Sequence, residues 1–386
     1  MAPIKACVVG LGLGGLAFHV PFVLALPDLF TLHAVMERNP AGPGGKVQER
    51  FGEKAMQGTI IHRTFEDVLA DAQVELVIIT TPSETHYELA KRALEAGKHV
   101  LVDKPLSPTK KEILELGRIA TNKNVVLYSF QNRRWDSDFL AFRKLLSLPA
   151  DDPKSLGTLY EFESRFDRFR LDLKGTWKDL PLPGNGLAFD LASHTIDQVI
   201  QLFGRPKSIT AMIENIRGIG SPEVDDSFTI YLHYPPLPAA SGIQPTSLTA
   251  ILRGHILSVR SPQVRYVARG THGTFQKFGV DVQEDQLRAV ADPAGIAADT
   301  AFGVEPEAIW GTVQNVAGDG TVVESSWPSA EPGKYIELFK NLAAVIRDGA
   351  EPAVRWTESA EVIEMIELAH QSARERRTVD VPPSLA

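Results

Sequence analysis

The chain has 386 residues, of which 44% are hydrophobic and 23% are charged, so it has the composition of a folded globular protein. At about 100–200 residues per domain, this length predicts two or three domains. The net charge of −8 argues against a nucleic-acid-binding protein, and no apolar segment approaches the roughly 20 residues that span a bilayer. The single cysteine, Cys7, excludes an intramolecular disulfide and a cysteine zinc cluster. We therefore expect a cytoplasmic protein that holds no metal.

The first third of the chain alternates short apolar runs with helical patterns. Runs rich in β-branched residues, separated by helices, are typical of parallel strands that are covered on both faces. A helix is predicted between Ser83, which can cap its start, and Gly97, which ends it. The predicted strands cover 5–10, 31–37, 74–82, 99–105 and 125–130. We expect a doubly wound Rossmann domain over residues 1–130.

Beyond residue 130 the pattern changes to strands with few helices between them, which favours a mostly antiparallel sheet. The predicted strands cover 159–166, 208–216, 227–234, 247–257 and 263–268, and the predicted helices cover 187–203, 335–347 and 359–376. Residues 289–332 are rich in Gly, Pro and Ala and predict long loops. We therefore expect an α/β protein whose second domain covers 131–386, with last helices that can pack back on the first domain.

A glycine-rich turn follows the first predicted strand. Residues Gly10-Leu11-Gly12-Leu13-Gly14-Gly15 match the G-x-G-x-x-G pattern. In this pattern the first glycine allows a tight turn, the second lets the backbone approach a pyrophosphate, and the third lets the next helix pack closely. The position of this turn between a strand and a helix predicts a dinucleotide site formed by Gly10, Gly12 and Gly15.

Two adjacent residues at the end of the second predicted strand indicate different dinucleotides. The carboxylate of Glu37 suits the adenosine ribose hydroxyls and slightly favours NAD. The guanidinium of Arg38 suits a 2′-phosphate and favours NADP. A surface Glu-Arg pair without a role in binding is a third interpretation. The sequence leaves the choice between NAD and NADP open.

Two further motifs carry groups suited to catalysis. Lys104, in Asp103-Lys104-Pro105, ends a predicted parallel strand, where ligands of such sheets bind, so it is either a substrate contact or an ordinary surface lysine. Asp190 and His194 are four residues apart and share one face of a predicted helix. A carboxylate beside an imidazole can orient it as an acid/base, although such pairs are also purely structural.

Less specific candidates follow. The adjacent residues Arg133 and Arg134 can bind a ligand or form salt bridges between domains. Asp167 lies in a strand pattern and can reach a cleft from it, and Trp177 lies in a segment that is either a cofactor contact or a solvated loop.

The order of these motifs resembles the glucose–fructose oxidoreductase / inositol dehydrogenase / rhizopine catabolism (Gfo/Idh/MocA) family. The resemblance rests on the glycine motif, Thr80-Thr81-Pro82 with His86, Asp103-Lys104-Pro105, Asn132-Arg133-Arg134-Trp135-Asp136, and Asp190-x-x-x-His194-x-x-Asp197. One departure is Asp103, where the family usually has Glu.

The resemblance implies an NAD(P)-dependent dehydrogenase of carbohydrate or polyol metabolism. It implies a large C-terminal open sheet through which a homodimer or homotetramer forms, and a sugar or polyol substrate. Lys104, Asp190 and His194 take the catalytic positions, and Arg133 is a further substrate contact. Asp167, from its place in the strand pattern, is also expected to contact the substrate. The cofactor contacts that it implies are Thr80, Pro82, His86 and Asp103. Leu13, Thr81, Asn132 and Trp177 are further expected cofactor contacts. The alternative function is a non-catalytic, dinucleotide-sensing regulator like the galactose-pathway repressors, which keep this fold.

Overall fold

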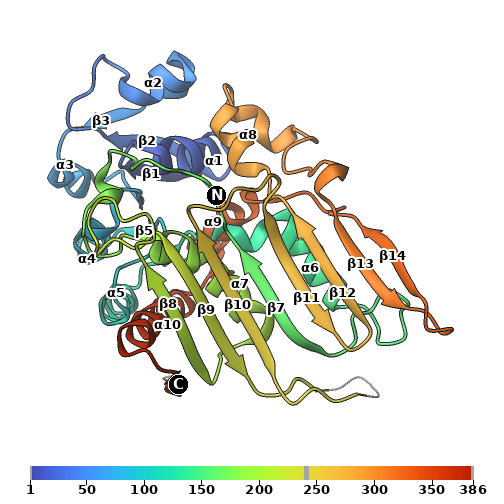
Figure 1. Cartoon of the computed structure of the whole chain (residues 1–386). Helices are drawn as coiled ribbons and strands as arrows, with labels where there is room; N and C mark the ends of the chain where they lie inside the picture. The colour runs from blue at the N-terminus through green and yellow to red at the C-terminus, as the bar shows by residue number, and fades with distance from the viewer. Residues whose placement is uncertain (1, 239–242, 384–386) are drawn as a thin grey trace. The chain divides into compact units, whose positions relative to one another are not determined.

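The computed structural model describes residues 2–238 and 243–383, which form two compact units (Figure 1). Unit 1 comprises Met1–Asn132, Val282–Gly303 and Lys334–Glu361, and unit 2 comprises Arg133–Asp281, Val304–Gly333 and Val362–Ala386. Each unit therefore contains segments that are far apart in the sequence. Among the described residues, no helix combines the length and the apolar character needed to cross a membrane.

Unit 1 contains a parallel six-stranded sheet with the strand order β3-β2-β1-β4-β5-β6. The order reverses between β1 and β4, which is the switch point of a Rossmann fold. The predicted fold of the N-terminal part is thus confirmed, although the short strand β3 was not predicted. The strands are β1 (Ile4–Val9), β2 (Phe30–Met36), β3 (Ile60–His62), β4 (Leu76–Ile79), β5 (His99–Val102) and β6 (Leu127–Ser129).

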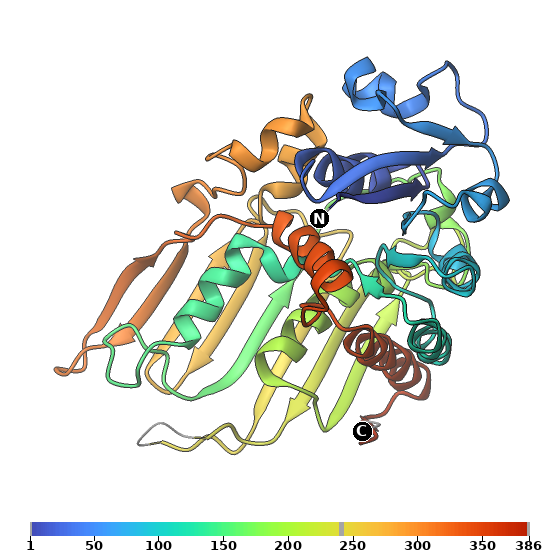
Figure 2. The same cartoon turned by 180° about the vertical axis from the view of Figure 1, so that it is seen from behind.

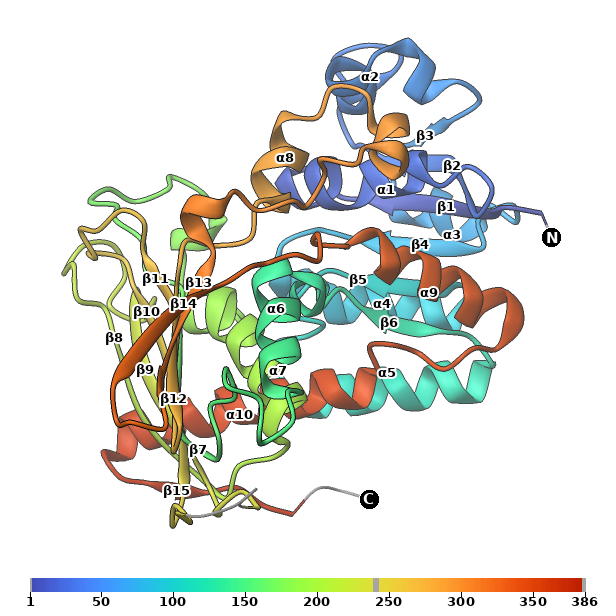
Figure 3. The same ribbon diagram turned by 90° about the vertical axis from the view of Figure 1, so that its right-hand side faces the viewer.

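Helices flank this sheet, with α1 beside α9 and α4 beside α5 (Figure 3). The ring of Phe339 on α9 lies 5.1 Å from that of Phe22 on α1 and 6.0 Å from that of Phe130, so apolar burial holds this late helix in unit 1. The helices are α1 (Val20–Ala25), α2 (Gly45–Phe51), α3 (Phe65–Ala70), α4 (His86–Glu95), α5 (Lys110–Lys123), α8 (Gln283–Ala289) and α9 (Ile336–Asp348).

Unit 2 contains a nine-stranded sheet with the order β14-β13-β12-β11-β7-β10-β9-β8-β15. All neighbouring strands are antiparallel except β7 and β10, which confirms the prediction of a mostly antiparallel sheet. The strands are β7 (Leu159–Arg165), β8 (Ser208–Glu214), β9 (Ser227–Tyr234), β10 (Leu248–His255), β11 (Val264–Gly270), β12 (Gly273–Phe278), β13 (Gly311–Val316), β14 (Val322–Trp327) and β15 (Val379–Asp380).

The prediction of long loops over 289–332 was wrong in its second half, where β13 and β14 form a hairpin. The Gly, Pro and Ala residues that flank these strands indicated loops. Most side chains of β14 are exposed, so this strand lacks the apolar alternation that predicts a strand.

Helices α6 (Ser137–Leu146) and α7 (Ser193–Phe203) lie across one face of the nine-stranded sheet (Figure 2). Their rings meet on Phe162 of β7, which is 4.9 Å from Phe142 of α6 and 5.7 Å from Phe203 of α7, measured between ring centroids. The long closing helix α10 (Trp356–Glu375) begins in unit 1 and ends in unit 2. The packing of α7 on β7 fixes this helix, which carries His194 in its first turn and directly follows the segment of Asp190.

Candidate active site

The glycine-rich turn follows β1 at the carboxyl end of the parallel sheet. A β-carbon on Gly10, whose φ is 101°, would lie 2.9 Å from the backbone of Thr80, and a β-carbon on Gly15 would lie 2.1 Å from the carbonyl oxygen of Gly10. Both glycines are therefore needed for close packing. A β-carbon on Gly12 would meet nothing within 4 Å. The open backbone at Gly12 suits the close approach of a pyrophosphate, so these residues fit a dinucleotide.

Glu37 and Arg38, which directly follow β2, lie in different environments. The Glu37 side chain is only 7% exposed, and its Oε2 accepts a 3.0 Å hydrogen bond from the backbone N–H of Lys46 in α2. Arg38 is exposed, and its carbonyl oxygen accepts a 2.8 Å hydrogen bond from Nε of the exposed Arg63. One carboxylate oxygen of Glu37 is thus engaged within the protein, and two arginine side chains lie at the surface beside it.

Two loops at the same edge are held together by a buried histidine. The ring nitrogens of His86 lie 2.7 Å from the carbonyl oxygen of Thr81, after β4, and 2.7 Å from that of Pro105, after β5. The Thr80 hydroxyl donates to the carbonyl oxygen of Gly10. His86 therefore positions the loop that carries Lys104, and Thr80 ties the loop after β4 to the glycine turn.

Asp103 lies between the glycine turn and Lys104. Its Oδ1 accepts a 2.7 Å hydrogen bond from the Lys104 backbone N–H, and its Oδ2 lies 3.8 Å from Nε2 of the buried His19. Burial raises the pKa of Asp103, but the His19 ring and the Lys104 charge outweigh burial and hold this pKa below its usual value. A β-carbon on Gly14 would lie 2.7 Å from Asp103 Oδ2, so this carboxylate packs directly on the glycine turn.

The helix of Asp190 and His194 begins with a π-helical segment, Ala188–Ala192, that continues into α7. Its start is held by Asp225, which no sequence pattern indicated. Asp225 Oδ2 accepts a 2.7 Å hydrogen bond from the Ala188 N–H, and its carbonyl oxygen accepts one of 2.9 Å from Leu187 N–H. Burial raises the pKa of Asp225 to about 6.

The Asp190 carboxylate lies among lysines. Its Oδ1 is 3.1 Å from Nζ of Lys178, and its Oδ2 is 3.8 Å from Nζ of Lys174. Lys174 was not singled out in the sequence, because only the folded loop brings it to Asp190. His194 follows on α7 and is 5% exposed, with its ring 6.3 Å from that of Phe166.

The adjacent arginines form ion pairs inside unit 2. Arg134 contacts Asp197 of α7 through two hydrogen bonds of 2.9 and 2.6 Å, and Arg133 NH1 lies 3.3 Å from Asp136 Oδ2. Each of these two ion pairs joins residues of unit 2. The Arg134–Asp197 pair anchors α7. Gln198 of the same helix adds a 2.8 Å hydrogen bond to the Arg133 carbonyl oxygen.

A second anchor of α7 is the fully buried Arg265 of β11. Its Nε donates to Asp138 Oδ2 at 2.9 Å, and its NH2 donates to Gln198 Oε1 at 3.1 Å. Its guanidinium also lies 4.1 Å from the centre of the Phe166 ring. Sequence patterns gave no signal for this residue, because its partners come from distant elements.

The remaining candidates of unit 2 lie in loops beside the sheet. Asp167 Oδ1 accepts a 3.0 Å hydrogen bond from the His255 N–H at the end of β10. Trp177 is partly exposed, and its carbonyl oxygen accepts a 2.7 Å hydrogen bond from the Asn185 side chain. Asn132, the last residue of the first segment of unit 1, is buried.

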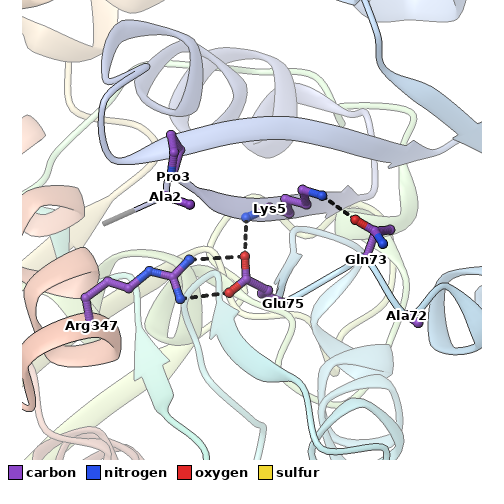
Figure 4. A pocket seen from close by; sticks show the side chains of 7 residues that line it. All are labelled: Ala2, Pro3, Lys5, Ala72, Gln73, Glu75 and Arg347. Atoms are coloured by element: carbon purple, nitrogen blue, oxygen red, sulfur yellow. Dashed lines mark hydrogen bonds and ion pairs between the residues drawn. The ribbon is translucent and has the colours of Figure 1, made fainter.

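A surface cavity of unit 1 is lined by Lys5 and Glu75, at the starts of β1 and β4, and by Arg347 of α9 (Figure 4). Its charged groups are paired: Glu75 accepts hydrogen bonds from the Lys5 N–H at 3.0 Å and from Arg347 NH2 at 3.1 Å, and Lys5 Nζ donates to Gln73. Ligands of such sheets bind at the carboxyl ends of the strands, so this cavity, at the amino ends of β1 and β4, is not the candidate site.

Comparison with models of known protein families shows the family of this chain. The model of the oxidoreductase family NAD-binding Rossmann fold (GFO_IDH_MocA) matches residues 4–131, and that of the family's C-terminal α/β domain matches residues 152–381. The chain belongs to the Gfo/Idh/MocA oxidoreductase family. The resemblance found in the sequence motifs is thereby confirmed.

Similar proteins cover this family member almost end to end. An uncharacterised oxidoreductase of Schizosaccharomyces pombe is 36% identical over 98% of this chain and 99% of its own. The scyllo-inositol 2-dehydrogenase (NADP(+)) of Bacillus subtilis is 33% identical over 97% of this chain and 95% of its own. The solved structure of the Bacillus subtilis protein yvaA has a TM-score of 0.82 at 31% identity, covering 98% of this chain and 100% of that one.

Proposed function

We propose that this Gfo/Idh/MocA protein is an NADP(H)-dependent dehydrogenase that oxidises a secondary alcohol of a sugar or cyclic polyol and reduces the corresponding carbonyl. The observation that carries the proposal is the glycine turn, closely packed at Gly10 and Gly15 and open at Gly12, beside the loop of Lys104. The name of the Bacillus subtilis relative, scyllo-inositol 2-dehydrogenase, supports a polyol substrate.

The environment of Glu37 and Arg38 supports NADP over NAD. Glu37 is buried and bonded to the start of α2, whereas Arg38 and Arg63 are exposed at the end of β2. A guanidinium pairs well with a phosphate, and two of them can bind a 2′-phosphate together. This proposal replaces the slight preference for NAD that Glu37 alone indicated. Leu13, Thr80, Thr81, Pro82, Asp103, Asn132 and Trp177 are proposed as further contacts or neighbours of the dinucleotide, with His86 positioning their loops.

The proposed chemistry assigns proton transfer to unit 2 and charge stabilisation to unit 1. The nicotinamide, when bound, accepts or returns the hydride. During oxidation His194 takes the hydroxyl proton as general base, and Asp190 stabilises the resulting imidazolium. Lys104 donates a hydrogen bond to the same substrate oxygen and stabilises its developing negative charge. During reduction His194 donates the proton. Arg133 and Asp167 are proposed substrate contacts.

Turnover of a panel of polyols and sugars, followed by nicotinamide absorbance with NAD and with NADP, tests this function. We expect activity with NADP, and we expect Arg38→Ala to raise the KM for NADP about 10- to 100-fold because a charged hydrogen bond is lost. The KM for NAD should change much less. Arg118→Ala, which removes an exposed arginine of α5, is the matched control. An equal effect of Arg38→Ala on both dinucleotides would contradict the cofactor assignment.

A further inference from the structure

A segment rich in cations follows β7 in unit 2. We call the residues from Arg168 to Lys178 the basic loop; its four cationic side chains are Arg168, Arg170, Lys174 and Lys178. Two of them, Lys174 and Lys178, contact the carboxylate of Asp190. Because Asp190 lies one helical turn before His194, the loop borders the proposed acid/base of the reaction.

Most nearby carboxylates are engaged elsewhere. Asp179 Oδ2 accepts a 3.1 Å hydrogen bond from the Thr176 N–H and so fixes the shape of the loop. Asp226 Oδ2 accepts a 2.7 Å hydrogen bond from Nε of Arg217, which in turn donates at 2.8 Å to the carbonyl oxygen of Asp172. The Asp172 side chain itself is exposed and forms no ion pair within residues 2–238 and 243–383. Asp190 contacts both lysines, and the charge of Asp179 also acts on Lys174.

The cations of the basic loop are poorly compensated. In the part of the chain that the structure describes, neither Arg168 nor Arg170 forms an ion pair with a carboxylate, and Nε of Arg170 is buried without a hydrogen-bond partner. Burial lowers the pKa of Lys174 to about 8, and the charges of Lys178 and Arg170 add to this effect against the attraction of Asp190. A cluster of cations that is partly withdrawn from water is stabilised when it binds an anion.

We propose that the basic loop binds an anionic group of the substrate, a carboxylate or a phosphate, and that this enzyme therefore prefers an acidic sugar or polyol over a neutral one. The proposal rests on the dehydrogenase function and specifies its substrate. Arg170 supplies a planar guanidinium that can hold two anion oxygens, and Lys174 supplies a second charge beside Asp190. The loop is ordered in advance by Asp179 and by Asn185, whose amide donates to the carbonyl oxygens of Trp177 and Leu180.

Matched pairs of compounds test this preference. The pairs are glucuronate with glucose, gluconate with sorbitol, glucose 6-phosphate with glucose, and myo-inositol 1-phosphate with myo-inositol. The kcat/KM of each anionic compound is divided by that of its neutral partner. We expect this ratio to be about 10 or more in the wild type and to fall about 10-fold in Arg170→Gln and in Lys174→Gln. Carboxylate and phosphate pairs show which anion is bound.

Arg143→Gln is the matched control, because Arg143 is an exposed arginine of α6 and its loss changes the net charge equally. Equal efficiencies for anionic and neutral partners in the wild type would overturn the proposal. So would a rise in the KM for NADP, without a change in the ratio, in Arg170→Gln.

If no compound of the panel is turned over, thermal stabilisation by the same anions separates the two proposals. A melting temperature that rises with an anionic compound in the wild type, but not in Arg170→Gln, supports the anion site even though the proposed reaction fails. No difference between the two proteins overturns the anion site.

Discussion

The candidate residues of unit 1 and those of unit 2 are held in place in different ways. In unit 1 the glycine turn is a continuous segment, and its close contacts are to Thr80 and Asp103, at the ends of the adjacent strands β4 and β5. In unit 2 the helix of His194 is held by Asp225, which bonds to Ala188, and by Arg265, which bonds to Gln198 of the helix, and both come from distant segments. The glycine turn of unit 1 therefore has a local sequence signature. The helix of His194 in unit 2 depends instead on long-range contacts that each add to stability.

The largest expected effect is a loss of stability when the buried contacts of unit 2 are broken. Arg265→Met should lower the free energy of unfolding by about 3–5 kcal/mol, because it leaves the buried carboxylate of Asp138 without its cation. Chemical denaturation measures this change. Arg269→Met, which removes an arginine of the same strand that is 43% exposed and paired with Glu161, should cost less than about 1 kcal/mol. Similar losses in the two variants would show that α7 does not depend on the buried network.

A second prediction concerns Asp225, whose pKa is raised by burial from the usual 3.8 to about 6. Between these pH values the folded state binds more protons than the unfolded state, so stability falls as the pH rises through this window. The contribution of Asp225 to this fall is at most about 3 kcal/mol. Asp225→Asn keeps an acceptor for the Ala188 N–H and should remove that part of the pH dependence.

The measurement is the free energy of unfolding from pH 4 to 7 in both proteins. Asp151→Asn, an exposed carboxyl group of the same unit, serves as the control and should leave the profile unchanged. An Asp225→Asn profile as steep as that of the wild type would show that another group is responsible.

The smallest effects are expected in the glycine turn, where two variants separate folding from binding. Gly15→Ala should destabilise unit 1 by about 1–3 kcal/mol, because its β-carbon would lie 2.1 Å from the Gly10 carbonyl oxygen. Gly12→Ala should leave the melting temperature unchanged, since its β-carbon meets no atom, yet weaken dinucleotide binding about 10-fold. Calorimetry with NADP distinguishes these outcomes. Unchanged binding in Gly12→Ala would mean that no pyrophosphate approaches this residue.

The same contrast explains what the sequence could predict. The pattern of apolar residues and the spacing of the glycines were enough to predict the Rossmann sheet, because its strands are continuous apolar runs between helices. The short strand β3 and the exposed hairpin β13–β14 lack such runs and were missed. The spacing of Asp190 and His194 placed them on one helix, but the lysines beside Asp190 and the buried Arg265 are brought there only by tertiary folding.

The central claim is that His194 transfers the proton in a dehydrogenase reaction. The most direct test is kcat with NADP, for any polyol or sugar that the wild type oxidises, in His194→Ala, together with the Kd for NADP. We expect kcat to fall about 10²- to 10⁴-fold while the Kd for NADP is unchanged. A His194→Ala protein that retains its kcat would contradict it.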